Sequence, residues 1–295
     1  MNVAGIPLKN PLILCSGVLG ISSALFARLE KAGMGGIVTK SISLRPTEGY
    51  PPPTVVPVAG GVLNAMGLPN PGVDAFLEEV GEASLSIPLI ISVFGTDAKE
   101  VAAMVDRVSP YCDAVELNLS CPHAGGLLAI GQNPCLVRSV VASAARAATV
   151  PVVAKLTPNV TDITEIGKAA EEGGADAVSA INTVRGMAID IHQAYPVLSN
   201  VSGGLSGPAV KPIGMKCVWD LAGAIDIPII GIGGISSGED VVEYLMAGAS
   251  AVELGTCLGS GGIEQVTAIR DGLDAWCSAR HTTYEALSRS VRDKF

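Results

Sequence analysis

The sequence is poor in positive charge, and this limits the partners that it can bind. It has 19 Lys and Arg against 28 Asp and Glu, which gives a formal net charge of −9. No cluster of Lys or Arg interrupts this acidic background, so the chain would repel the phosphate backbone of nucleic acid. We expect no nucleic-acid partner, whereas a small anion can still be bound by backbone amides at a helix start.

The chain also lacks the patterns of secretion, of a membrane span and of a metal site. It contains no 18-residue apolar run and no charged N-terminal segment leading into an apolar core. We therefore expect no membrane span and a cytoplasmic location. The seven cysteines form no C-x-x-C pair and no zinc-like spacing with histidine; they stand at positions 15, 112, 121, 135, 217, 257 and 277. Reduced thiols and no metal are expected.

Apolar residues and glycine are what the chain has in abundance. Hydrophobic residues make up 48% of the 295 positions, charged residues make up 16%, and 35 positions are glycine. This composition favours a fold that buries apolar strands under helices and turns tightly between them. Because an α/β barrel commonly reaches this length as one domain, we predict a single domain over residues 1–295.

A repeated unit of helix, turn and short apolar strand runs along the chain. Eight strands are expected, within residues 11–16, 31–41, 88–95, 109–120, 151–156, 172–183, 228–234 and 246–256. Amphipathic stretches alternate with them, near residues 23–32, 72–84, 97–108, 134–148, 162–173, 211–225, 238–247 and 264–279. Eight such units favour a (β/α)8 TIM barrel, with a doubly wound open sheet as the alternative. Residues 41–71 and 186–210 are predicted to be long loops that cover a site.

Polar residues and glycines follow the predicted strands, where the reacting groups of a barrel enzyme gather. Each one alone could be an ordinary loop residue, but together they should face one cavity: Ser16, Lys40, Asn118, Lys155, Asn182, Gly233, Gly234, Gly255 and Thr256. Lys40 and Lys155 directly follow strands that should be buried, so we expect an anionic ligand. Residues 229–240 and 252–256 combine glycine turns with a helix start, as is typical of a barrel phosphate site.

One cysteine stands apart by its position. In NLSCPH, residues 118–123, Cys121 comes just after a strand end, and Pro122 should hold it in a loop. A thiolate at this place could act as a base. The alternative, an inert buried thiol, suits the other cysteines better: Cys15, Cys112, Cys217 and Cys277.

Five motifs together resemble the dihydroorotate dehydrogenase family, and the likeness covers almost the whole chain. They are LNAMGLPNPG at 63–72, NLSCPH at 118–123, KLTPNVTDI at 155–163, INTVRGMAIDI at 181–191 and GGLSGPAVKPI at 203–213. The resemblance implies FMN-dependent oxidation of dihydroorotate to orotate in pyrimidine biosynthesis. It also implies that Cys121 removes the C5 proton while the hydride at C6 passes to FMN.

The resemblance further implies which residues bind each molecule. FMN would be held by Ser16, Lys40, Ser41, Asn118, Lys155, Ile181, Gly207, Gly233, Gly234, Gly255 and Thr256. The substrate would be contacted by Lys40, Asn64, Ala65, Met66, Gly67, Leu68, Asn118, Asn182 and Thr183. A planar substrate with amide, imide and carboxylate groups needs such donors and acceptors together with a cation.

Within the family, the chain is most similar to class 1B. Cysteine rather than serine at position 121 is similar to class 1, and the segments GMAIDI and GGLSGPAVKPI are similar to class 1B. That resemblance implies a second subunit that carries FAD and a 2Fe–2S cluster and passes electrons to NAD, although fumarate or another acceptor stays open. The chain has neither a dinucleotide fingerprint nor a cysteine cluster, so a partner must supply this relay. A homodimer, or a heterotetramer with that subunit, is expected.

His123 departs from the pattern, because many family members have at this position an Asn that touches the substrate. A flavin barrel acting on uracil-type pyrimidines, similar to the dihydropyrimidine dehydrogenases, is therefore one alternative. A flavin-free isomerase or lyase could use the same phosphate site, and a non-catalytic binding barrel is a third possibility. His192 and His281 are expected to be ordinary surface or loop residues.

Overall fold

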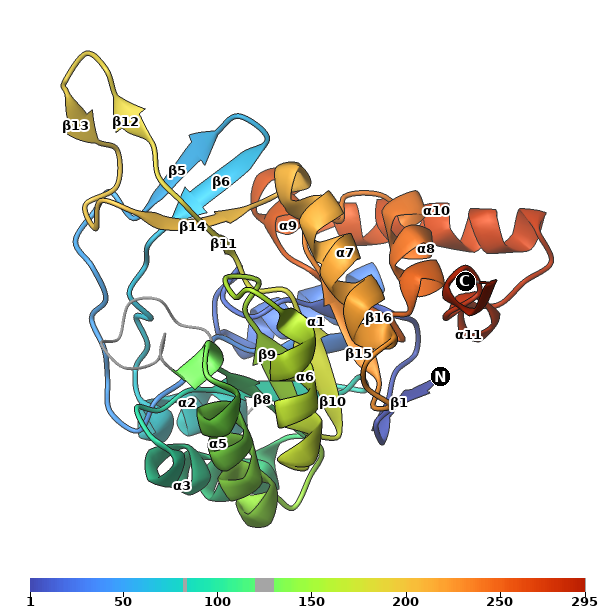
Figure 1. Ribbon diagram of the computed structural model, residues 1–295, viewed down its shortest axis with the longest axis horizontal. Coiled ribbons are helices and arrows are strands. Elements are labelled where there is room, and N and C mark those ends of the chain that lie inside the picture. Colours follow the sequence, from blue (N-terminus) through green and yellow to red (C-terminus); the bar gives the residue numbers. More distant parts are fainter. Residues whose placement is uncertain (82–83, 120–129, 295) are drawn as a thin grey trace.

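A closed barrel of eight parallel strands forms the centre of the computed structural model, which describes residues 1–81, 84–119 and 130–294 (Figure 1). In chain order the strands are β3 Leu12–Leu14, β4 Gly36–Val38, β7 Leu89–Val93, β8 Ala114–Asn118, β9 Val152–Leu156, β10 Ala177–Ala180, β15 Ile229–Ile232 and β16 Ala251–Leu254. Strand β16 pairs with β3, with Val252 opposite Leu12, and this pairing closes the ring. The eight predicted strands are confirmed, and the open-sheet alternative is wrong.

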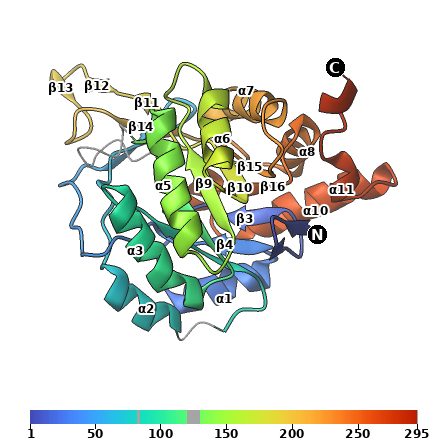
Figure 2. The same cartoon turned by 60° about the horizontal axis from the view of Figure 1, so that its bottom comes forward.

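Helices alternate with these strands and pack on the outside of the barrel. They are α1 Ser23–Ala32, α2 Val73–Gly81, α3 Ala98–Val108, α5 Pro134–Ala147, α6 Ile163–Glu172, α7 Lys211–Ala222, α8 Gly238–Ala247 and α10 Glu264–Ala279. Each lies inside a predicted stretch, and Figure 2 shows α3, α5 and α6 side by side along the barrel wall. Shorter helical segments were not predicted: α9 Thr256–Gly261, α11 Tyr284–Leu287, η1 Ser109–Tyr111, η2 Pro208–Val210 and η3 Arg292–Lys294. None of the helices in the described ranges combines the length and apolar character needed to cross a membrane.

Inside the barrel, the period of two along each strand sorts side chains into an apolar and a polar layer. The apolar layer consists of Ile13, Val38, Ile90, Ala114, Val153, Ala177, Ile230 and Ala251. A second, mostly polar layer consists of the residues that follow these by two positions: Cys15, Lys40, Ser92, Glu116, Lys155, Ser179, Ile232 and Glu253. Side chains alternate in direction along a strand, so both layers face the barrel interior.

A short N-terminal hairpin covers the amino end of the barrel. Strand β1 Asn2–Val3 pairs antiparallel with β2 Ile6–Pro7. Val3, Ile6 and Leu8 pack against the apolar interior layer. The amino end of the barrel is therefore filled by side chains, and polar chemistry is confined to the other end.

The two segments predicted to be long loops contain strands that pair with each other, so the loop assignment was wrong. Strands β5 Val55–Val58, β6 Gly61–Asn64, β11 Val184–Gly186 and β14 Gly203–Ser206 form one antiparallel sheet in the order β11-β14-β6-β5, here called the roof sheet. Leu205 lies opposite Leu63 across its centre. Each strand is short, and the pairing of β6 with β14 joins residues 140 apart in the chain, so the local pattern is weak. A further hairpin, β12 Ile189–Asp190 with β13 Tyr195–Pro196, projects beyond this sheet (Figure 1).

Candidate active site

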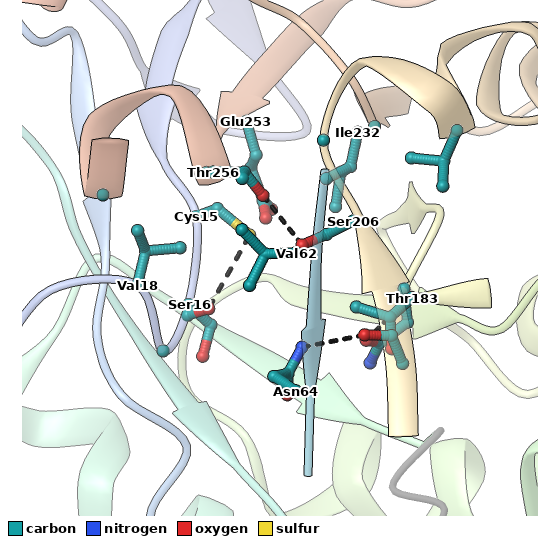
Figure 3. A pocket seen from close by; sticks show the side chains of 18 of the residues that line it. Cys15, Ser16, Val18, Val62, Asn64, Thr183, Ser206, Ile232, Glu253 and Thr256 are labelled. Atoms are coloured by element: carbon teal, nitrogen blue, oxygen red, sulfur yellow. Dashed lines mark hydrogen bonds between the residues drawn. The ribbon is translucent and has the colours of Figure 1, made fainter. Parts of the chain in front are cut away.

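A cavity of about 680 Å³ lies between the carboxyl ends of the barrel strands and the roof sheet. Ligand sites typically measure roughly 300–1,000 Å³. All eleven residues predicted to hold FMN line this cavity: Ser16, Lys40, Ser41, Asn118, Lys155, Ile181, Gly207, Gly233, Gly234, Gly255 and Thr256. In Figure 3, Ser16, Glu253 and Thr256 reach it from the barrel, while Asn64 and Ser206 reach it from the roof sheet.

Eight of the nine residues predicted to contact the substrate line the same cavity: Lys40, Asn64, Met66, Gly67, Leu68, Asn118, Asn182 and Thr183. Ala65 is the exception. Its side chain is fully buried and packs with Leu63 and Leu198. Its backbone N–H donates to the Thr54 carbonyl oxygen at 2.7 Å. Ala65 therefore packs behind the cavity-lining residues Asn64 and Met66 and does not itself line the cavity.

Three charged side chains from separate strands meet in the polar layer of the barrel: Glu116 on β8, Lys155 on β9 and Glu253 on β16. We call them the buried charge cluster, because their exposed fractions are 1%, 4% and 1%. Lys155 Nζ donates to Glu253 Oε2 at 2.8 Å and to Glu116 Oε1 at 3.3 Å. Burial alone would lower the pKa of Lys155, but the adjacent Glu116 and Glu253 raise that pKa well above its usual value. The ammonium therefore stays charged.

The two carboxylates of this cluster differ in their hydrogen bonding. Glu116 accepts from Lys155 and also from Ser179 Oγ at 2.9 Å. Glu253 Oε2 accepts from Lys155, whereas the buried Oε1 has no hydrogen-bond partner among the described residues. Burial and then repulsion from Glu116 raise the pKa of Glu253 to about 8, although Lys155 opposes the shift. The sequence predicted an anionic ligand beside Lys155, but the carboxyl groups of Glu116 and Glu253 already provide part of the negative charge there.

A chain of hydroxyl and amide groups links the strand ends around the cavity. Asn182 Nδ2 donates to Asn118 Oδ1 at 3.3 Å, and Asn118 Nδ2 donates to Ser41 Oγ at 3.1 Å. Ser41 Oγ lies 2.9 Å from Ser92 Oγ and 3.2 Å from Ser16 Oγ. These bonds fix the orientation of both amide groups, so each presents a defined donor or acceptor to a ligand.

Glycine turns follow β15 and join the barrel to the roof sheet. Gly207, Gly233 and Gly234 have φ values of 103°, 128° and 68°, a region in which other residues are strained. At Gly234 a Cβ atom would come 2.7 Å from the Lys211 backbone nitrogen. Thr256 Oγ1, at the start of α9, donates to Ser206 Oγ of the roof sheet at 2.8 Å. The main chain can therefore approach a phosphate closely at these turns.

A carboxylate from the first turn of α8 binds the backbone just before this helix. Asp240 Oδ2 accepts from the backbone N–H of Ser236 at 2.8 Å and of Ser237 at 2.9 Å. Ser237 Oγ in turn accepts from the Asp240 N–H at 3.2 Å, which completes a capping box. Lys211 Nζ also donates to Asp240 Oδ1, at 2.5 Å. The Asp240 carboxylate therefore occupies the N–H groups of Ser236 and Ser237, so a phosphate here would depend on other amides, such as those at the glycine turns, and on Thr256.

The predicted base, Cys121, and its neighbour His123 lie outside the described residues. Asn118, the last residue of β8, lines the cavity, and Leu119 after it is buried. Asn118, three positions before Cys121 in the sequence, is therefore the described cavity residue next to the predicted base.

A family model described as Dihydroorotate dehydrogenase matches residues 1–276. The chain belongs to the dihydroorotate dehydrogenase family. A relative from Pyrococcus abyssi is 50% identical over 277 residues, which cover 94% of this chain and 93% of the relative. One from Methanocaldococcus jannaschii is 48% identical over 292 residues (97% and 95%), and one from Methanosarcina mazei is 54% identical over 262 residues (87% and 83%). All three are named dihydroorotate dehydrogenase B (NAD(+)), catalytic subunit.

Membership of the dihydroorotate dehydrogenase family confirms the resemblance drawn from the five motifs. The matched region includes all eight barrel strands and both parts of the roof sheet. The names of the relatives also agree with the predicted likeness to class 1B catalytic subunits. A flavin-free isomerase or lyase is accordingly no longer a competing assignment.

Sequence reasoning did not assign Cys15 and Glu253, which line the cavity, to the site, nor Ser92 and Glu116, which bond to the lining residues Ser41 and Lys155. A signal for the two carboxylates was present, because both stand in the sequence AVEL, at 114–117 and 251–254. In each copy the Glu lies two positions after an inward-facing Ala, so a period of two places it inside the barrel. Cys15 was expected to be an inert core residue, yet it lines the cavity. Burial raises the pKa of its thiol well above the usual value, so the thiol stays protonated.

Proposed function

We propose that this chain is the FMN-binding catalytic subunit of a cytoplasmic dihydroorotate dehydrogenase, which oxidises (S)-dihydroorotate to orotate in pyrimidine (UMP) biosynthesis. One observation carries the proposal. The eleven residues chosen for FMN and eight chosen for the substrate line a single cavity, although they come from segments far apart in the sequence. Residues 1–295 would act together as one FMN-binding barrel domain.

The chemical character of the cavity suits FMN. Lys40 and Lys155 bring ammonium groups, and Ser16, Ser41 and Thr256 bring hydroxyls. The glycine turns at 233–234 and 255 allow backbone amides to approach a phosphate. FMN supplies the hydride acceptor when it is bound. The role of the protein would be to anchor the phosphate and to keep the charged ammonium of Lys155 beside the cofactor.

The chain would orient the substrate through amides that are already held in place. Thr183 N–H donates to Asn182 Oδ1 at 2.8 Å, while Asn182 Nδ2 donates to Asn118. Asn64 Nδ2 donates to the Gly204 carbonyl oxygen at 3.3 Å, which fixes it to the roof sheet. Lys40 would pair with the substrate carboxylate. Such preorganised groups lower the barrier by restricting the substrate to a reactive orientation.

Cys121 is proposed as the general base that takes the C5 proton. We expect Cys121→Ala to lose nearly all dihydroorotate-driven flavin reduction while keeping FMN, because the base is gone and the cofactor contacts remain. Cys121→Ser should keep some activity, shifted to higher pH, because a hydroxyl is a weaker acid than a thiol. Anaerobic stopped-flow absorbance of the flavin would measure both.

The exposed Cys135 on α5 offers a matched control. Cys135→Ala should reduce flavin at the parental rate. If both Cys121 variants also kept the parental rate, Cys121 would not be the base.

His123 makes substrate choice worth testing directly. We propose dihydroorotate, because Lys40 lines the cavity and provides a cation for its carboxylate. Turnover of dihydroorotate should greatly exceed that of dihydrouracil, which has no carboxylate. The reverse order would favour the dihydropyrimidine dehydrogenase alternative.

Electron transfer to NAD is proposed to need a partner subunit that carries FAD and a 2Fe–2S cluster. The printed names of the relatives, which include both NAD(+) and catalytic subunit, support this division of work. The assembly would be a heterotetramer built on a homodimer of this chain. Purification from the native host, followed by an assay of dihydroorotate-dependent NAD reduction, tests partner and acceptor together. Reduction of fumarate instead of NAD by the purified complex would overturn this part.

A further inference from the structure

The buried charge cluster carries an imbalance of charge that a proton can remove. With Glu116 and Glu253 both ionised and Lys155 charged, the cluster has a net charge of −1 in the interior of the barrel. All three side chains are at least nine-tenths buried, and an uncompensated buried charge is costly. One additional proton would make the cluster neutral.

We propose that Glu253 is a positioning residue that holds this proton on Oε1, and that its ionisation changes the charge of the cluster, and so of the adjacent cavity wall, from 0 to −1. The first part concerns this chain alone, whereas the effect on a bound cofactor rests on the proposed function. The groups facing Glu253 are Glu116 from β8, Lys155 from β9 and Cys15 after β3.

Hydrogen bonding assigns the proton to Glu253 rather than to Glu116. Glu116 accepts from two donors, Lys155 at Oε1 and Ser179 at Oε2, so both of its oxygens have a partner. Glu253 accepts from Lys155 through Oε2, and its Oε1 is buried without a partner in the described part of the chain. An unsatisfied oxygen is less costly in a neutral carboxyl group than in a carboxylate.

The position of Glu253 connects this proton to the cofactor cavity. Glu253, Lys155 and Cys15 all line it. While Glu253 is neutral, Lys155 is balanced by Glu116 alone. When Glu253 ionises, the added negative charge opposes any cofactor that gains negative charge on reduction. The protonation state of Glu253 would thereby set how readily the bound flavin is reduced.

The first test measures the proton without FMN. Because the pKa of Glu253 is raised from 4.5 to about 8, the folded chain holds a proton that the unfolded chain releases between these values. Stability should therefore fall as pH rises through this window. Glu253→Gln is permanently neutral and should escape that loss, so its melting temperature should rise relative to wild type between pH 5 and 8.5. Glu165→Gln, an exposed change on α6, should follow wild type throughout.

The second test measures the flavin itself in the holoenzyme. In wild type and in Glu165→Gln, the plot of midpoint potential against pH should bend near pH 8, where Glu253 ionises. Glu253→Gln should lack the bend while keeping bound FMN. Ser179→Ala removes one donor to Glu116, so the charge of Glu116 is less compensated and opposes the ionisation of Glu253 more strongly, which should move the bend to higher pH. Ser179→Ala also provides a test if Glu253→Gln does not fold.

The two tests separate the possible failures. If wild type binds no FMN, the proposed function fails, and the melting curves alone decide whether Glu253 holds the proton. If FMN binds but wild type and Glu253→Gln share one pH dependence in both measurements, the assignment to Glu253 is overturned and the proposed function is untouched.

Discussion

The buried charge cluster shows how single residues of this site depend on one another. Lys155, Glu116 and Glu253 come from three strands and exchange hydrogen bonds at 2.8 and 3.3 Å. Such a cluster is weak evidence for stability, because removing charges from water is expensive. Loss of Lys155 is nevertheless costly, since it pairs with both carboxylates.

Replacing the central ammonium should reveal this dependence. Lys155→Met leaves the buried Glu116 carboxylate without its counter-charge and should lower the free energy of unfolding by roughly 3–5 kcal/mol. Urea denaturation measures the change. Adding Glu116→Gln to Lys155→Met should recover part of the loss, because the unpaired buried carboxylate is then removed. Lys168→Met on the exposed face of α6 should change stability by no more than about 0.5 kcal/mol. An equal effect of both lysine substitutions would contradict the role of the cluster.

Individual helices and strands were predicted best where their signal is local. Helix α3, for example, begins at Asp97, whose side chain accepts from the N–H groups of Lys99 and Glu100. Such caps, glycine turns and apolar runs are contiguous in the sequence, so the eight barrel strands and their helices could be predicted from it. The roof sheet could not, because the pairing of β6 with β14 joins two segments that no local pattern connects.

The cap of α8 should be important for stability. Asp240→Ala removes an acceptor for the N–H groups of Ser236 and Ser237 and should cost roughly 1–2 kcal/mol at neutral pH. Burial tends to raise the pKa of Asp240, but bonds from Lys211 and Ser236 outweigh it and lower this pKa below 3.8. The stabilisation is therefore present above that value and is lost as pH falls through the lowered pKa. Denaturation curves should thus converge with wild type in strong acid.

The neighbouring Glu239 provides a control for this prediction. It lies in the same first turn of α8 and caps no backbone group in the described structure. Glu239→Ala should cost less than about 1 kcal/mol. A loss equal to that of Asp240→Ala would mean that charge near the helix end, and not capping, explains the effect.

The roof sheet should affect the substrate more than the cofactor. At Gly204 a Cβ atom would overlap Thr183 Oγ1 and come 2.5 Å from Thr183 Cβ. Gly204→Ala should displace Thr183 and lower kcat/KM for dihydroorotate by roughly 10–100-fold, because small misplacements are costly in catalysis. FMN content should not change. Steady-state kinetics and flavin absorbance test both statements.

Gly81→Ala is the matched glycine control, because a Cβ atom there meets nothing within 4 Å. It should leave kcat/KM at the parental value. If Gly204→Ala behaved in the same way, Thr183 would not contribute to the reaction.

On the scale of the whole molecule, the two ends of the barrel have different tasks. The amino end is filled by the N-terminal hairpin and the apolar interior layer. The carboxyl end carries the cavity and nearly every residue predicted for the site. The sequence identified those residues because strand ends and family motifs coincide. It did not identify the buried charge cluster, because Glu116 and Glu253 acquire their environment only when the barrel closes.

This division predicts that stability and cofactor binding can be changed separately. Ile6 is fully buried at the amino end of the barrel, so Ile6→Ala should lower the free energy of unfolding by roughly 2–5 kcal/mol. The FMN dissociation constant should remain at the wild-type value, since the hairpin is remote from the cavity. Ile191→Ala, at an exposed position, should change neither quantity. A large loss of FMN affinity in Ile6→Ala would contradict this separation of the two ends.

The pairing of β6 with β14 also has a consequence for synthesis on the ribosome. Asn64 and Gly204, which bond across these strands, are 140 residues apart in the chain. A nascent chain that has already released β5 and β6 must therefore wait for most of the barrel to be translated before the partner strand emerges. The cavity wall above the flavin site is consequently among the last surfaces to be completed, and premature termination before β14 would leave an unfinished site.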